Sequence, residues 1–170
     1  KLAYVTEDRK GNGQILSKSI KMNTTLANMS GISNGKVIDT DKEYAVAEEY
    51  RKKLKTKCPT VEQNVGNLSG GNQQKVLLAK WMFAEPDILI LDEPTRGIDV
   101  GAKYEIYCII NDLVAAGKSV IMISSELPEV LGMSDRIYIM NEGKFVGEVG
   151  KEEATSELIM SKIVKSGKGA

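Results

Sequence analysis

The chain has 170 residues, enough for one domain with a substantial hydrophobic core. Hydrophobic residues make up 42% of it and charged residues 27%, as in ordinary globular proteins. Its 23 basic and 23 acidic residues give a formal net charge of zero, which argues against a dedicated nucleic-acid surface. The apolar runs are too short for a helix that spans a bilayer.

Histidine is absent, and the two cysteines, Cys58 and Cys108, form no CxxC pair. The absence of histidine excludes Ser-His-Asp triads, Cys-His dyads and zinc sites with histidine ligands. Two isolated cysteines are best interpreted as free thiols that are buried or half-exposed, and such thiols fit a reducing compartment.

Apolar patterning and turn residues divide the chain into strands and helices. In chain order, we predict a strand at residues 2–5, a helix at 22–29, a turn at 31–35, helices at 40–55 and 69–82, a strand at 88–91, a helix at 103–115, a strand at 119–124, a helix at 127–131, a hairpin of 136–140 with 145–149, and a helix at 156–164 before frayed residues 166–170. Thr40 and Glu43 have capping-box spacing, which starts that helix at Thr40. Lys75 is interpreted as a solvated helix position.

The order of these elements indicates the fold class. From residue 86 onward strands alternate with helices, which is typical of an α/β domain with a mainly parallel sheet. The continuously apolar runs at 88–91 and 119–124 are typical of strands buried on both faces of such a sheet. We interpret residues 22–82 as an inserted helical subdomain, 83–150 as the α/β core, and 151–170 as a C-terminal helix and tail.

A glycine-rich turn precedes the helix predicted at 69–82. Ser69, Gly70 and Gly71 let the backbone approach a ligand closely, and the helix that follows directs its free N–H groups and positive dipole end at the same place. This geometry suits a terminal phosphate. The alternative is an ordinary Ser-capped helix after a glycine turn, and this short motif alone does not decide between them.

Two acids follow the apolar strand at 88–91. Ligands of open α/β sheets bind at the carboxyl ends of the strands, which is where Asp92 and Glu93 would lie. Asp92 could hold Mg²⁺ and Glu93 could polarise an attacking water, as phosphoryl transfer requires. The alternative is that both acids cap the turn before Pro94.

Together these motifs resemble the ABC ATPase family, and the resemblance covers residues 3 to about 160. It identifies an LSGGNQ signature at residues 68–73, a Walker B strand whose metal-binding acid is Asp92 and whose catalytic glutamate is Glu93, and a D-loop at residues 97–99. The signature residues that would bind ATP are Leu68, Ser69, Gly70, Gly71, Asn72 and Gln73, and those of the D-loop are Gly97, Ile98 and Asp99. The resemblance implies a partial P-loop NTPase-like core with an inserted helical subdomain, and ATP and Mg²⁺ as cofactors.

The phrases NQQK, DEPTRGIDVGAK and ISSELPEVLGMSDRI are similar to those of the second ATPase domain of bacterial sugar importers, in the multiple-monosaccharide, ribose, xylose and galactoside subfamilies. That resemblance implies an ATPase subunit for monosaccharide import, located peripherally on the cytoplasmic face of the bacterial membrane. Its partners would be its own N-terminal ATPase domain, membrane permease subunits and, indirectly, a sugar-binding protein, with no nucleic acid.

The chain departs from the family pattern in three ways. No GxxxxGK[ST] phosphate loop occurs in it, and it begins at Lys1 directly before a strand, so we expect a piece of a longer protein without ATPase activity of its own. Glu7 stands where most members carry the Gln of the Q-loop. Ser125 stands where most carry a switch His, and Ser cannot carry its positive charge.

The family pairs its domains head to tail, so this chain would hold parts of two sites. Ser69 would complete the site of the N-terminal ATPase domain, and Glu93 would belong to the second site. Because Ser125 replaces the switch His, we expect the second site to bind ATP but to turn it over slowly or not at all. The alternative functions are a non-transport ABC ATPase and a fragment that is inactive as an enzyme.

Overall fold

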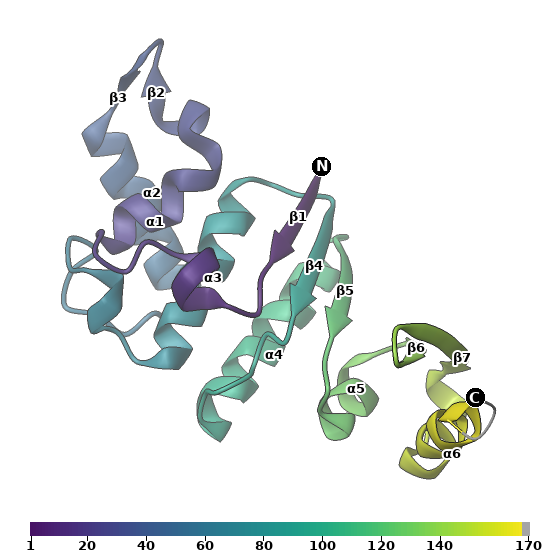
Figure 1. Ribbon diagram of the computed structural model, residues 1–170. Coiled ribbons are helices and arrows are strands. Elements are labelled where there is room, and N and C mark those ends of the chain that lie inside the picture. Colours follow the sequence, from purple (N-terminus) through teal and green to yellow (C-terminus); the bar gives the residue numbers. More distant parts are fainter. Residues whose placement is uncertain (168–170) are drawn as a thin grey trace. The chain divides into compact units, whose positions relative to one another are not determined.

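The computed structural model describes residues 1–167 and divides the chain into two compact units, Lys1–Ile123 and Ser124–Ala170 (Figure 1). Each unit has its own set of packed elements, and each is described by itself. No helix of the described residues is long and apolar enough to cross a membrane.

The first unit contains a three-stranded parallel sheet in the order β1-β4-β5 (Figure 1). These strands are β1 (Leu2–Val5), β4 (Ile88–Asp92) and β5 (Ser119–Ile123). The register pairs Val5 with Leu91 and Asp92 with Ile123, so the carboxyl ends of the three strands lie side by side. The predicted mainly parallel α/β core is therefore confirmed.

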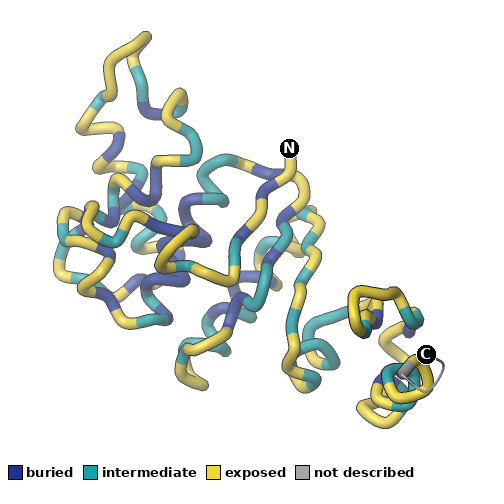
Figure 2. The backbone as a smooth tube through the Cα atoms, in the orientation of Figure 1, coloured by how far each residue is buried: buried dark blue, intermediate teal, exposed yellow. Residues whose placement is uncertain are grey.

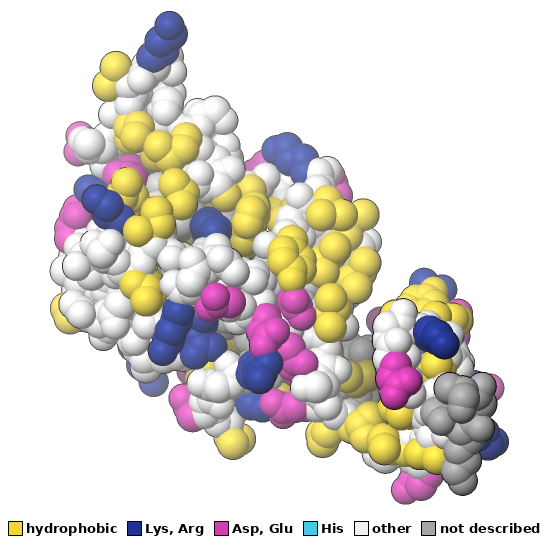
Figure 3. All heavy atoms as spheres, in the orientation of Figure 1, with side chains coloured by type: hydrophobic (Ala, Val, Ile, Leu, Met, Phe, Trp, Pro, Cys, Tyr) yellow, Lys and Arg dark blue, Asp and Glu magenta, His cyan; other side chains and the backbone are white. Residues whose placement is uncertain are grey.

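Within the first unit, only one face of this sheet is covered, and buried and exposed residues alternate along β1 (Figure 2). Ala3, Val5, Leu89 and Leu91 are buried, and helices α3 and α4 contact the sheet. The alternate positions form the exposed apolar face visible in Figure 3: Leu2, Tyr4, Ile88, Ile121 and Ile123, each exposed by 38–62%. The prediction that strands 88–91 and 119–124 are buried on both faces is wrong for the first unit, because side chains alternate along a strand and this unit covers only one side of the sheet.

The rest of the first unit is mainly helical. Its elements are η1 (Arg9–Gly13), α1 (Ile20–Thr25), η2 (Leu26–Ile32), the short strands β2 (Ser33–Asn34) and β3 (Val37–Ile38), α2 (Thr40–Lys53), η3 (Val65–Asn67), α3 (Gly70–Phe83) and α4 (Val100–Ala115). A cluster of buried residues joins α1, α2 and α3: Ile20, Ala47, Val61, Val65, Leu68 and Val76. Both cysteines are free thiols, as predicted. Cys58 is half-buried and packs against this cluster, whereas Cys108 is exposed, so the prediction of a buried or half-exposed thiol is wrong for Cys108.

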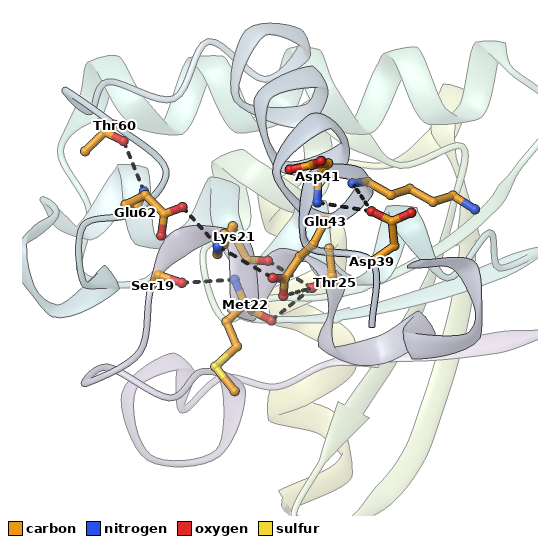
Figure 4. A network of polar contacts seen from close by, with 10 residues as sticks. Ser19, Lys21, Met22, Thr25, Asp39, Asp41, Glu43, Thr60 and Glu62 are labelled. Carbon is orange, nitrogen blue, oxygen red and sulfur yellow. Dashed lines mark hydrogen bonds and ion pairs between the residues drawn. The ribbon is translucent and has the colours of Figure 1, made fainter. Parts of the chain in front are cut away.

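A polar network links α1 to α2 beside that cluster (Figure 4). Thr25 Oγ1 donates a hydrogen bond of 3.1 Å to the buried carboxylate of Glu43. Lys21 Nζ lies 3.8 Å from Glu43 and 2.9 Å from Glu62, so one lysine bridges two acids. The Glu43 carboxylate therefore binds Thr25 and Lys21, and it does not accept from the backbone N–H of Thr40 as a capping box would require.

The N-cap of α2 is Asp39, and the predicted capping box at Thr40 is wrong. One carboxylate oxygen of Asp39 accepts from the backbone N–H groups of Asp41 at 3.1 Å and Lys42 at 3.0 Å (Figure 4). These bonds satisfy two of the amides that a helix start leaves without partners. The bond from the Lys42 amide is the main reason that the pKa of Asp39 is lowered.

Lys75 on α3 is buried, contrary to its interpretation as a solvated position. Only 2% of its side chain is exposed, and its Nζ lies 2.7 Å from Glu105 of α4 and donates to the Lys55 carbonyl at 3.1 Å. Lys55 itself has a left-handed φ of 51° just after α2. A single ammonium therefore joins α3, α4 and the end of α2.

The second unit is built on an antiparallel hairpin. It contains α5 (Leu127–Met133), β6 (Arg136–Asn141), β7 (Lys144–Gly150), η4 (Lys151–Glu153) and α6 (Ser156–Gly167). Glu142 and Gly143 both have positive φ, as a tight two-residue hairpin turn requires, and the predicted hairpin is confirmed. The helix α6 extends past its predicted end at 164, and residues 168–170 of the predicted frayed tail lie outside the described residues.

Replacing Asp39 with Ala is expected to lower the urea midpoint of this chain at neutral pH, because two amides of α2 lose their acceptor. Since the pKa of Asp39 is lowered on folding, its stabilisation is present above the ordinary value of about 3.9 and is lost as the pH falls through the lowered value. Urea unfolding followed by circular dichroism at neutral pH and at about pH 2 would measure the difference. Thr40→Ala is the control, and a larger loss for that variant would contradict the cap at Asp39.

Replacing Lys75 with Met is expected to lower the free energy of unfolding by about 1–3 kcal/mol, because the Lys55 carbonyl and Glu105 lose a buried donor. Glu105→Gln is the matched variant: it keeps an acceptor for Lys75 and involves the partner that is 42% exposed, so it should cost about 1 kcal/mol or less. Urea denaturation of both variants would test this. Equal losses of unfolding free energy in the two variants would mean that the stabilisation comes from the charge pair with Glu105, and not from the bond of the ammonium to the Lys55 carbonyl.

Candidate functional site

The two acids after β4 lie at the carboxyl edge of the sheet. Asp92 is the last residue of β4, and both Asp92 and Glu93 are half-buried. Glu93 has a left-handed φ of 46°, and its N–H donates to the Ile123 carbonyl at the end of β5 at 2.9 Å. A non-glycine residue rarely adopts this conformation. It ends the extended path of β4, so the Glu93 side chain does not continue the alternation of side chains along the strand.

Tyr4 is a neighbour of Asp92 that sequence reasoning missed. Its hydroxyl donates to the Asp92 carboxylate at 2.5 Å, and this bond is the main reason that the pKa of Tyr4 is raised. Tyr4 pairs with Ile90 across the parallel ladder, so it lies one strand over and on the same side of the sheet as Asp92. Only the register of two strands that are distant in sequence reveals this contact.

The predicted signature turn begins α3. Ser69 is exposed and is the N-cap residue, but its hydroxyl makes no cap hydrogen bond. Instead it accepts from Asn72 Nδ2 at 2.9 Å, and Asn72 Oδ1 accepts from the Lys57 amide at 2.8 Å. Asn72 thus fixes the hydroxyl beside a helix N-terminus whose first amides have no partner within the helix.

Two other signature residues point inward. Leu68 is buried, and the Gln73 amide donates to the carbonyls of Val65 at 3.3 Å and Leu68 at 3.2 Å. The structure therefore does not bring the Gln73 side chain to the exposed turn. Its amide holds the start of α3 against the preceding η3 segment.

Gly70 and Gly71 are required by packing within the chain. A Cβ on Gly71 would lie 2.5 Å from the Cβ of Ala102 in α4, and a Cβ on Gly70 would lie 2.9 Å from Nη2 of Arg9. The sequence predicted that these glycines allow a ligand to approach. The structure adds that the backbone of this turn already lies against α4 and Arg9.

The predicted D-loop follows Glu93. Gly97 has a φ of 69°, and the half-buried Ile98 leads to Asp99, which is the N-cap of α4 and accepts from the Ala102 amide at 2.9 Å. Glu7, predicted at the Q-loop position, is exposed and forms an ion pair with Arg96 beside this loop. The described first unit thus brings together Glu7, Asp92, the D-loop and the signature turn.

Ser125 belongs to the second unit. It is exposed and lies between β5 and α5, where the neighbouring Glu126 amide donates to Ser124 Oγ at 3.1 Å. It is therefore on a separate compact unit from the other candidate residues.

The donor set suits a magnesium ion that is shared with a phosphate ligand. Among the residues that the structure describes, no group of three or more His, Cys, Asp or Glu residues could enclose a metal. Magnesium typically keeps several waters and is held by one or two carboxylates together with substrate phosphates. Asp92 offers one carboxylate at the sheet edge, and the Tyr4 hydroxyl holds it in place by a hydrogen bond. A single positioned carboxylate fits that pattern.

Comparison with known proteins gives the same family. The model of ABC transporters matches residues 3–96. Relatives include the L-arabinose transport ATP-binding protein of Geobacillus stearothermophilus, which is 62% identical over 97% of this chain and 32% of its own length. The xylose import ATP-binding protein of Geobacillus kaustophilus is 56% identical over 94% of the chain and 32% of its own length. The ribose import ATP-binding protein of Clostridium tetani is 53% identical with the same coverage.

Solved structures show the fold. An inward-facing ABC transporter of the putative metal-chelate type superimposes with a TM-score of 0.78 at 16% identity, covering 96% of this chain and 64% of the other. A bacterial ABC transporter cassette solved as a dimer gives a TM-score of 0.73 at 22% identity, covering 89% and 63%. The chain spans about a third of the length of the curated relatives that it matches. With this family match and these identities, the chain belongs to the ABC transporter family.

Proposed function

We propose that the chain is part of the ATP-hydrolysing subunit that energises import of a monosaccharide across the bacterial cytoplasmic membrane. The observation that carries this proposal is the identity of 62% over 97% of the chain with an L-arabinose transport ATP-binding protein. The relatives are named for arabinose, xylose and ribose, which are all pentoses, so a pentose is the sugar class that we propose. Sugar specificity would reside in partner proteins.

The proposed domain organisation follows the same relatives. Residues 1–170 would be the C-terminal portion of one ATPase domain, with a helical subdomain at about 22–82, an α/β core at 83–150 and a C-terminal helix and tail at 151–170. The partners would be the protein's own N-terminal ATPase domain, membrane permease subunits and, indirectly, a sugar-binding protein. The subunit would sit peripherally on the cytoplasmic face of the membrane.

The residues have separate roles in this proposal. The exposed Ser69 and the free amides at the start of α3 would bind the terminal phosphate of ATP held by the N-terminal domain. Asp92 would hold Mg²⁺, which when bound neutralises charge on the phosphates. Glu93 would accept a proton from the attacking water at its carboxylate. Glu7 and the D-loop would border the same edge of the sheet.

The two sites would be unequal. Ser125 occupies the position of the switch His, and a serine hydroxyl cannot supply a positive charge next to the phosphate. The site that uses Ser69 would therefore carry most of the turnover. The site that uses Glu93 would bind ATP and turn it over slowly or not at all.

The signature proposal can be tested by completing a site in trans. This chain, mixed with the N-terminal ATPase domain of its parent protein, is expected to tighten the binding of a fluorescent ATP analogue with Mg²⁺, because Ser69 and the start of α3 add phosphate ligands. Ser69→Ala should abolish the gain. The chain alone should show no ATPase activity, because it has no phosphate loop. No change on mixing, with a native circular dichroism spectrum, would contradict the signature role.

The inequality can be tested in the full-length protein. Glu93→Gln is expected to lower the ATPase rate by less than about tenfold, whereas the same change at the equivalent acid of the first ATPase domain should cost about a hundredfold or more. The matched pair differs only in which site loses its proton acceptor. Equal losses would contradict the assignment of unequal sites.

A further inference from the structure

Arg9 lies where three segments of the first unit meet. Its Nη1 donates to the Arg96 carbonyl at 2.8 Å, and its Nη2 lies 3.5 Å from the Gly97 carbonyl. The same Nη2 would lie 2.9 Å from a Cβ on Gly70. One planar guanidinium from the segment after β1 therefore contacts the D-loop turn and lies against the signature turn.

A second contact joins the segment after β1 to the turn after Glu93, and in this contact the charged side chain of the turn is the cation. The Arg96 guanidinium pairs with the Glu7 carboxylate, while the Arg96 carbonyl accepts from Arg9. The Arg96 amide in turn donates to the Glu93 carbonyl at 3.1 Å. This crossed arrangement of Glu7, Arg9 and Arg96, here called the arginine clamp, is thus one hydrogen bond away from the candidate catalytic glutamate.

The surroundings of Arg9 indicate that its role is geometric. A cation beside the N-terminus of a helix is disfavoured by the helix dipole, so charge alone does not explain its position at the start of α3. Its two terminal nitrogens face successive carbonyls, and a rigid planar fork holds both at a fixed spacing, whereas the ammonium of a lysine is a compact charge on a flexible stem. Gly97, whose carbonyl faces Arg9, has a left-handed φ and is exposed.

We propose that Arg9 is a positioning residue that fixes the D-loop turn against the signature turn, so that the half-site containing Glu93 and the half-site containing Ser69 keep one spacing. This inference rests on the proposed function for its effect on catalysis. Without the clamp, the signature turn would still bind phosphate, but its position relative to the D-loop would vary. Misplacement of this kind lowers turnover more than it lowers binding.

The test uses Arg9→Ala and Arg9→Lys in the full-length protein, with Lys10→Ala as the matched control because Lys10 is exposed in the same η1 turn. Hydrogen exchange measured by mass spectrometry is expected to become faster in peptides covering residues 69–76 and 93–102 for both Arg9 variants, and to stay unchanged for Lys10→Ala. Peptides covering residues 136–150 of the second unit serve as the internal reference. Unchanged exchange at the two turns, or faster exchange in the reference as well, would overturn the clamp.

Steady-state ATPase and nucleotide-binding assays complete the test. The Arg9 variants are expected to lower kcat by about tenfold or more while the Kd for ATP stays within about threefold. A loss of affinity that accounts for the loss of activity would mean that Arg9 binds nucleotide directly, and that would overturn a positioning role. A wild-type protein that does not hydrolyse ATP would contradict the proposed function, whereas the exchange data would still decide whether the clamp exists.

Discussion

The parallel register of β1, β4 and β5 is the constraint on which the candidate site depends. Because Val5 pairs with Leu91 and Asp92 with Ile123, the three strands end together, although the segments that follow them are far apart in the sequence. The ends of these strands deliver Glu7, Glu93 and their neighbours to one edge. A slip of one residue in β4 would turn Asp92 to the other face and break its hydrogen bond with Tyr4.

Helix α3 acts as the rigid body that carries the signature turn, because its polar side chains are anchored inward. Gln73 donates to carbonyls of the preceding segment, Lys75 joins α4, and Lys80 donates to the Gly13 carbonyl at 2.7 Å. Burial lowers the pKa of Lys80, because removal from water disfavours its charged form. At the start of α3 the first amides have no partner within the helix and Ser69 makes no cap hydrogen bond to them, and this is the end where phosphate is expected.

The short-range features of the chain could be predicted from its sequence, and the long-range contacts could not. The strand ending in Asp92, the helix beginning after Ser69 and the hairpin at 136–150 follow from apolar runs and turn residues. The contacts of Tyr4, Arg9 and Lys75 connect residues that are up to 88 positions apart, and no local pattern encodes them. The spacing of Thr40 and Glu43 predicts a cap one residue after the true N-cap, Asp39, because the sequence does not show that Glu43 bonds Thr25 in the folded chain.

The same contacts explain why the two glycines of the signature turn cannot be read as ligand contacts alone. Gly71 packs against Ala102, and Asp99 caps the helix that presents Ala102, so the D-loop and the signature turn share α4 as well as Arg9. A movement of the turn after Glu93 would therefore be transmitted to Gly70 through a guanidinium and to Gly71 through a helix. Within the first unit, the D-loop and the signature turn are therefore linked by two contiguous contacts, one through the Arg9 guanidinium and one through α4.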